Sequence, residues 1–179
     1  MLIRQRHGEQ GFSLIEVSIV MVIIAVVLMF GVPGFAEWSQ NTQIRATAES
    51  IESGLQSARA EAIRRNVRID FRLNGTAGDE GITGWVVRET ASGTVLHSKP
   101  NGESSTRVKI TPLPSGEDTV TFDGTGRSPA GTTNMTQIDI DSGALSASAS
   151  RNLRIVISIG GQIRMCDPTV TASGDPRRC

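Results

Sequence analysis

The chain has 179 residues, and its 18 Lys and Arg side chains are balanced by 18 Asp and Glu side chains. This length allows one modest domain beside a membrane segment, and nothing in it requires a second domain. The zero net charge excludes a global attraction to nucleic acid or to anionic lipid, although local basic patches remain possible. Hydrophobic content is 38% and is concentrated near the N-terminus, so the remainder is expected to be a soluble domain.

The first element is an apolar segment with one acidic residue near its start. Residues 17–32 carry no charge, and the apolar character extends back to Phe12, which gives roughly the 20 residues needed to cross about 30 Å of hydrocarbon. A charged side chain at that depth costs about 2.5 to 3.5 kcal/mol and is usually paired. No basic residue lies between Phe12 and Glu37, so Glu16 needs a partner from outside the segment.

The residues before this segment suggest the source of that partner. Residues 1–11 form a short polar stretch with two arginines, and the small residue Gly11 precedes the apolar run. An ordinary secretory signal instead has its cleavage site after the hydrophobic region. Cleavage after Gly11 would place a new α-amine on Phe12, one helical turn from Glu16. That ammonium would pair with Glu16 of its own chain or of an adjacent copy.

The junction Gly11-Phe12-Ser13-Leu14-Ile15-Glu16 resembles the class III leader junction of type IV pilins and type II secretion pseudopilins. The resemblance implies that a prepilin peptidase cleaves after Gly11 and N-methylates Phe12. It also implies that Glu16 docks onto the amine of a neighbouring Phe12 as the subunit enters a helical filament. The simpler alternative is a signal anchor with one stray acidic residue.

After Pro33 and Gly34, the hydrophobic spacing predicts an amphipathic helix that ends near Asn66. Its apolar positions recur every three or four residues, at Ile44, Ala48, Ile51, Leu55, Ala58, Ala62 and Ile63. Its polar face includes Arg45, Glu49, Glu52, Arg59 and Glu61. The predicted organisation is a leader at 1–11, a transmembrane or filament-core half of the helix at 12–35, an amphipathic half at 36–66 and a β-rich head at 67–179.

The head is predicted to be β-structure. Residues 67–73 alternate apolar Val67, Ile69, Phe71 and Leu73 with charged residues, which is the period-two pattern of a half-buried strand. Further strand candidates, separated by turn-forming sequences, are 82–89, 94–99, 106–113, 119–124, 136–141, 153–159 and 162–166. Residues 141–150 are expected to be a low-complexity loop with little to bury. The predicted fold class is α+β, a long helix packed on antiparallel sheet, with the strand order open.

Three further stretches, "ARAEAIRRN", "VTFDGTGR" and "LRIVISIGGQIRMCDP", resemble the GspH/FimT family of minor pilins and minor pseudopilins. The resemblance implies a type IV pilin fold and a low-copy subunit at or near filament tips, which helps to form the priming complex of a type IV pilus. Some members serve in secretion pseudopili instead. The implied partners are the prepilin peptidase, other minor and major pilins or pseudopilins, and an inner-membrane assembly platform.

The implied location is the inner membrane of a Gram-negative-type bacterium, with a single pass and a periplasmic head, and then the pilus or pseudopilus. An exported head reaches an oxidising compartment, so Cys166 and Cys179 are expected to form a disulfide worth roughly 3 kcal/mol. The bond would hold the Pro- and Gly-containing tail between them. A metal site is disfavoured because no histidine or further cysteine lies nearby.

Some relatives bind DNA during natural transformation through a Gly-Arg-x-Arg motif. The matching stretch here is residues 161–164, in which Arg164 is present but Gln162 replaces the first arginine. Loss of one phosphate-contacting cation weakens such a site, although four arginines lie nearby in sequence and could compensate, namely Arg151, Arg154, Arg177 and Arg178. The competing interpretation is that these arginines are ordinary solvated charges, balanced by neighbouring aspartates.

A second basic run surrounds the end of the predicted helix, at Arg59, Arg64, Arg65 and Arg68. Favourable interaction with the helix dipole, or contact with another subunit, explains it better than nucleic-acid binding does. No enzyme is predicted. With the leader removed His97 is the only imidazole, and no acid or nucleophile lies near it in sequence. No catalytic residue, metal or cofactor is therefore expected.

Overall fold

The computed structural model describes residues 12–75, 80–102, 106–129 and 134–179, apart from the side chains of residues 31–33. The predicted leader at 1–11, with Gly11, lies outside these residues. The chain divides into two compact units, with the division between Ala36 and Glu37. Helix α1, Leu14–Arg65, contributes its first part to one unit and its second part to the other.

The second part of α1 carries the buried stripe that the sequence predicts. Six positions at spacings of three and four are fully buried, namely Ile44, Ala48, Ile51, Leu55, Ala58 and Ala62. Burial of each isoleucine or leucine side chain contributes about 2 kcal/mol relative to exposure. Two assignments to faces of this helix are wrong. Ile63 is 50% exposed, and Arg59 is half buried because its Nε donates to the carbonyl oxygen of Gly126 at 3.0 Å.

Local sequence sets the end of α1. Asn66 has a positive φ of 53°, and its amide donates to the carbonyl oxygen of Ile63 at 3.4 Å. Asparagine is one of the few residues other than glycine that commonly takes this left-handed conformation after a helix. Arg64 and Arg65 occupy the last turn, where the helix dipole favours cations. The chain therefore leaves the helix directly into the first strand.

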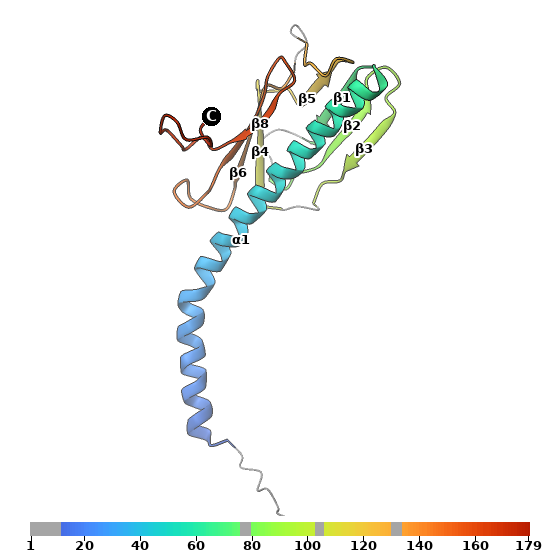
Figure 1. Cartoon of the computed structure of the whole chain (residues 1–179). Coiled ribbons are helices and arrows are strands. Elements are labelled where there is room, and N and C mark those ends of the chain that lie inside the picture. Colours follow the sequence, from blue (N-terminus) through green and yellow to red (C-terminus); the bar gives the residue numbers. More distant parts are fainter. Residues whose placement is uncertain (1–11, 76–79, 103–105, 130–133) are drawn as a thin grey trace, which may run out of the picture. The chain divides into compact units, whose positions relative to one another are not determined.

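The described residues of the head form eight strands, one for each predicted segment, and Figure 1 shows how most of them are arranged. They are β1 (Ile69–Leu73), β2 (Trp85–Glu89), β3 (Val95–Lys99), β4 (Val108–Leu113), β5 (Thr119–Phe122), β6 (Gln137–Ser142), β7 (Leu153–Ile157) and β8 (Ile163–Cys166). They build two four-stranded sheets with the orders β3-β2-β1-β5 and β4-β6-β7-β8. Every pairing between these strands is antiparallel, so the predicted α+β class is confirmed.

The second part of α1 lies alongside β1 and β2 in Figure 1, and a close approach at Gly54 explains how it does so. A Cβ atom at Gly54 would lie 2.8 Å from the Phe71 ring and 2.9 Å from the Trp85 indole. Ser50, one turn earlier, accepts hydrogen bonds from Trp85 Nε1 at 3.2 Å and from Lys99 Nζ at 2.9 Å. The helix is thereby fixed to three residues of the first sheet.

The other end of this part of α1 is fixed to the segment that precedes β7. The Asn41 side chain donates to the carbonyl oxygen of Ala149 at 3.0 Å and accepts from the amide of Arg151 at 2.8 Å. The sequence predicts that residues 141–150 form a loop that buries little. The structure instead buries two of their side chains, because Ser142 and Ser150 are each only 7% exposed. Their hydroxyl groups bond within the turn and to Asp141.

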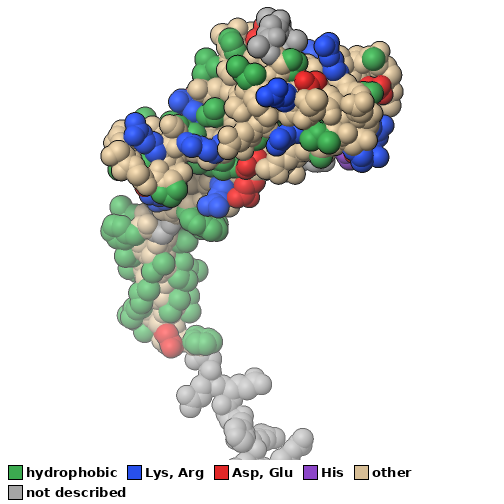
Figure 2. All heavy atoms as spheres, turned by 45° about the horizontal axis from the view of Figure 1, so that its top comes forward, with side chains coloured by type: hydrophobic (Ala, Val, Ile, Leu, Met, Phe, Trp, Pro, Cys, Tyr) green, Lys and Arg blue, Asp and Glu red, His purple; other side chains and the backbone are tan. Residues whose placement is uncertain are grey.

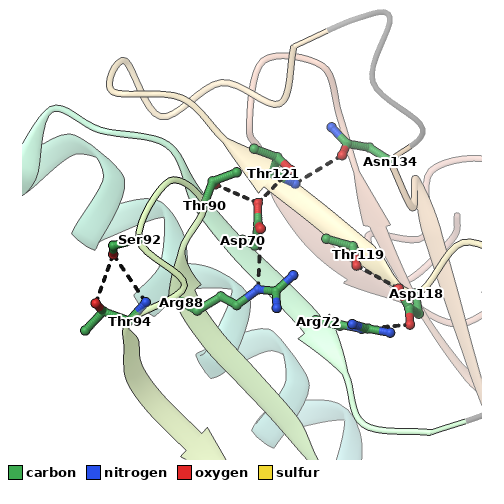
Figure 3. A network of polar contacts seen from close by, with 10 residues as sticks. All are labelled: Asp70, Arg72, Arg88, Thr90, Ser92, Thr94, Asp118, Thr119, Thr121 and Asn134. Carbon is green, nitrogen blue, oxygen red and sulfur yellow. Dashed lines mark hydrogen bonds and ion pairs between the residues drawn. The ribbon is translucent and has the colours of Figure 1, made fainter.

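Strand β1 departs from the predicted alternation at one residue. Ile69, Phe71 and Leu73 face the core as expected, but Asp70 is only 5% exposed. Its Oδ1 accepts from the hydroxyls of Thr90 at 2.8 Å and Thr121 at 2.9 Å, and Figure 3 shows this network over β1 and its neighbours. Burial of a charged carboxylate is tolerated because it is hydrogen-bonded.

Candidate functional site

The first part of α1 exposes apolar side chains all around its axis. Phe12 is 83% exposed, Leu14 is 88% exposed, and hydrophobic side chains cover the visible face of this segment in Figure 2. The Ser18 hydroxyl donates to the carbonyl oxygens of Leu14 at 3.1 Å and Ile15 at 2.8 Å, so it is satisfied within the helix. A helix that is apolar on every side needs lipid or other apolar helices around it.

By length and composition, no one helix among the described residues qualifies as a membrane span. The segments Leu14–Phe30 and Gly34–Arg65 meet the length and composition of a membrane span only as a bent pair.

Glu16 lies in the first turn of α1, where a local signal that the sequence analysis missed fixes its position. The amide of Glu16 donates to Ser13 Oγ at 3.2 Å, so Ser13 caps the helix. Ser13-Leu14-Ile15-Glu16 has the S-x-x-E spacing of a capping box, which was readable from the sequence. An acidic group is also favoured there by the helix dipole. Glu16 thus has a local stabilising role beside the predicted assembly role.

Glu16 shares one face of the helix with Phe12. A shallow groove of about 280 Å³ on this face is lined by Phe12, Glu16, Val17, Val20, Met21 and Ile24. The carboxylate is therefore the one charged group in an apolar surface strip that begins at the residue next to the predicted cleavage site. Gly11 lies outside the described residues, and pairing of Glu16 with an amine stays a prediction.

The C-terminal segment is closed by the predicted disulfide. Cys166, at the end of β8, is bonded to Cys179, thirteen residues later. Within this loop the amide of Asp167 donates to the carbonyl oxygen of Arg177 at 2.7 Å. Asp175 accepts from Arg177 Nη2 at 2.8 Å, and this hydrogen bond holds the pKa of the Asp175 carboxyl at about 2. The tail is thereby folded back beside the end of β8.

The residues matched to a DNA-binding motif are partly engaged within the chain. Arg164 Nη2 donates to the carbonyl oxygen of Arg178, and Arg177 pairs with Asp175. Gln162 lies in the turn between β7 and β8, where its amide donates to Ser158 Oγ at 3.0 Å. The structure brings Arg164 and Arg178 together, but it uses Arg164 to hold the tail. The contact depends on how the loop folds back, so sequence spacing gave no sign of it.

Two arginines of the basic run at the end of α1, Arg64 and Arg65, share one acidic partner. Glu61 accepts from Arg64 Nη2 and from Arg65 Nε, each at 2.6 Å. These hydrogen bonds, first from Arg64 and then from Arg65, lower the pKa of Glu61 to about 2. The arrangement stabilises the last turns of the helix and gives two of the four arginines a shared acidic partner.

The remaining candidate residues concern metal binding and the histidine singled out in the sequence. His97 is exposed on β3, an outer strand of its sheet. No group of three His, Cys, Asp or Glu side chains is arranged to hold a metal ion within the ranges that the structure describes.

Comparisons with known proteins agree with this description. The model of the family described as type II transport protein GspH matches residues 47–161, and the model of the prokaryotic N-terminal methylation motif matches residues 6–32. The crystal structure of the type IV minor pilin FimU from Pseudomonas aeruginosa strain PAO1 is similar, with a TM-score of 0.52 and 15% identity over 76% of this chain and 97% of that chain. A second crystal form gives a TM-score of 0.50 and 16% identity over 72% and 97%. We found no match among curated proteins.

A long N-terminal helix, apolar in its first part and packed through its second part on antiparallel sheets, is the type IV pilin fold, and this chain has that fold. The GspH model matches more than half of its length, and the chain belongs to the GspH family of minor pilins and pseudopilins. The resemblance found in the sequence is thus confirmed. The methylation motif implies processing by a prepilin peptidase, membrane anchorage and assembly with other pilins.

Proposed function

We propose that this chain is a minor pilin that takes part in type IV pilus assembly within the priming complex at the filament tip. One observation carries the proposal. The exposed apolar segment at residues 12–30, with Phe12 and Glu16 on one face at its start, belongs to a chain with a pilin-type head. Such a segment is stable first in lipid and then among the apolar helices of sister subunits.

In this proposal residues 1–11 are the leader, removed by cleavage after Gly11, and Phe12 then carries the methylated amine. Before assembly, residues 12–35 anchor the subunit in the inner membrane, and residues 36–66 join the anchor to the periplasmic head at 67–179. The basic residues of the leader mark the cytoplasmic side. The partners are the prepilin peptidase, other minor and major pilins, and the inner-membrane assembly platform.

Glu16 selects the register of assembly in this mechanism. Its carboxylate lies on an apolar face, where a lone charge is costly, and the amine of a neighbouring Phe12 relieves that cost. The cap at Ser13 offers a competing, purely local role. The two roles separate in Glu16→Gln, because glutamine can fill the acidic position of a capping box but carries no charge. The subunit works by packing and charge pairing, without covalent turnover.

A type II secretion pseudopilus is the alternative, and the description of the matching family as a type II transport protein favours it. The FimU structures come from a type IV minor pilin, but their identity to this chain bears on the fold alone. A DNA receptor has less support, because Arg164, the arginine that matches the motif, already donates to the carbonyl oxygen of Arg178 within the C-terminal loop.

Deletion and complementation separate these functions. Loss of the gene should abolish surface pili and twitching while secretion of extracellular enzymes stays intact. The opposite pattern would establish the pseudopilus alternative. Loss of transformation alone, reproduced by Arg164→Ala, would establish a DNA receptor. Gly11→Ala should leave unprocessed precursor, visible as a slower-migrating band.

A further inference from the structure

A groove with a basic lining lies where α1 enters the head. It has a volume of about 410 Å³ and is lined by Asn41 and Arg45 from α1, by Arg151 before β7, and by Asp167 and Arg177 from the disulfide loop. Asn41 forms a fixed part of its wall, because it bonds both Ala149 and the amide of Arg151. The groove is therefore built from three segments that the fold holds together.

The charge of the groove is positive. Three arginines face one aspartate, and Asp167 already accepts hydrogen bonds from the amide and hydroxyl of Thr169, at 2.9 and 2.6 Å. Arg45 and Arg177 each pair with a single acidic neighbour, but their side chains are 75% and 71% exposed. Arg177 uses Nε and Nη2 on Asp175, and Arg45 uses Nε on Glu49, so other N–H donors of both guanidinium groups remain available. Three such guanidinium groups suit phosphate oxygens.

The position of the groove along the chain indicates which phosphate it meets. Asn41 follows Gly34 by seven residues, or about 10 Å along the helix at 1.5 Å per residue. Trp38, between them, is 63% exposed, and tryptophan is enriched at the boundary between hydrocarbon and water. In a chain anchored through residues 12–35, the groove is therefore within reach of the lipid headgroups.

We propose that Arg45, Arg151 and Arg177 bind the phosphates of anionic phospholipids in the leaflet facing the head, and so hold the unassembled head against the bilayer. The inference rests on the membrane anchorage in the proposed function. DNA offers the same phosphate chemistry. The membrane fits better, because the groove begins two turns after the anchor and Arg164, the motif arginine, does not line it.

Hydrogen–deuterium exchange of the full-length chain in nanodiscs tests this contact. One set of nanodiscs contains phosphatidylcholine alone, and the other contains roughly a third phosphatidylglycerol. Backbone amides of 144–152 and 167–178 should exchange more slowly in the anionic bilayer. Each arginine near an anionic surface adds about fivefold to the occupancy of the docked state, so Arg151→Gln should reduce the protection by about that factor.

The matched control is Arg68→Gln, which removes the same charge from the segment between α1 and β1 and should retain full protection. Unchanged exchange of residues 44–62 shows that either variant is folded. Equal exchange rates in the two bilayers would overturn the headgroup contact. An equal loss of protection in Arg151→Gln and Arg68→Gln would also overturn it. Binding of short duplex DNA that depends on Arg151, without protection by lipid, would do the same. A chain that fails to enter the nanodisc would contradict the membrane anchorage of the proposed function. A chain that enters but shows no protection would contradict only the headgroup contact.

Discussion

The buried carboxylate of Asp70 provides the sharpest test of how the head is held together. Replacement by alanine removes the acceptor for the hydroxyls of Thr90 and Thr121 and the partner of Arg88, whose Nε lies 3.6 Å from Asp70 Oδ2 (Figure 3). Arg88 Nε is buried and makes no hydrogen bond within the described residues. The variant therefore leaves a cationic group without compensation in the first sheet.

The loss of stability that we expect for Asp70→Ala follows from these contacts. Hydrogen bonds to a charged group contribute about 1.5 kcal/mol or more each, and Thr90 recovers part of this because it is exposed to water. Breaking a buried pair costs up to about 3 to 5 kcal/mol, and less here because Arg88 is 37% exposed. We expect Asp70→Ala to lower the free energy of unfolding by about 3 kcal/mol, which is roughly 10 °C in Tm for a domain of this size.

Thermal unfolding of the full-length chain in detergent micelles, followed by near-UV circular dichroism, measures this loss. Trp85 is a suitable reporter, because it packs 5.8 Å from the Phe71 ring on the neighbouring strand. The matched control is Asp118→Ala, which removes a pair with Arg72 whose side chains are 47% and 33% exposed. That change should cost less than about 1 kcal/mol. Equal shifts in the two variants would refute the assigned role of Asp70.

Three further predictions concern the loop, a turn and pH. Replacing Cys166 and Cys179 by serine should cost about 3 kcal/mol, and reductant should then lower the Tm of the parent chain but not of the variant. Gly161→Ala should cost about 3 kcal/mol, because φ is +78° and a Cβ would collide with a carbonyl oxygen of the neighbouring turn. Gly93→Ala, at φ +70° with open space around it, should cost only about 1 kcal/mol in the same urea titration. Because the pKa of Glu61 falls from 4.5 to about 2 on folding, its stabilising effect is complete above pH 4.5 and is lost as pH falls toward 2. Glu61→Gln should therefore flatten the Tm profile in that window, and an unchanged profile would contradict the pairing with the arginines.

Much of the fold was readable because its elements have strong local periodicity. The stripe from Ile44 to Ala62 and the alternation around Phe71 each follow from one segment of sequence. The strand order was not readable, since eight short alternating strands permit many pairings, and the chain changes sheet at each of the three connections from β3 to β6. The burial of Asp70 was missed for the same reason, because its partners come from β5 and from the end of β2.

The candidate site shows the same division between local and distant information. Phe12, the cap at Ser13 and Glu16 lie within five consecutive residues at the start of the helix, so sequence spacing is enough to place them. The contact of Arg164 with Arg178 and the lining of the basic groove bring together residues that only the folded loop makes neighbours. Spacing along the chain carried no information about them.

The central claim is that Glu16 pairs with the amine of a neighbouring Phe12 during assembly. The most direct measurement is the fraction of processed subunit recovered in sheared filaments, compared with the fraction left in the membrane, for Glu16→Gln. Ser18→Ala serves as the control, because it alters a polar residue of the same segment whose hydroxyl bonds only its own helix. The account predicts normal cleavage of both variants, with filament incorporation lost for Glu16→Gln and retained for Ser18→Ala. Normal incorporation of Glu16→Gln would contradict it.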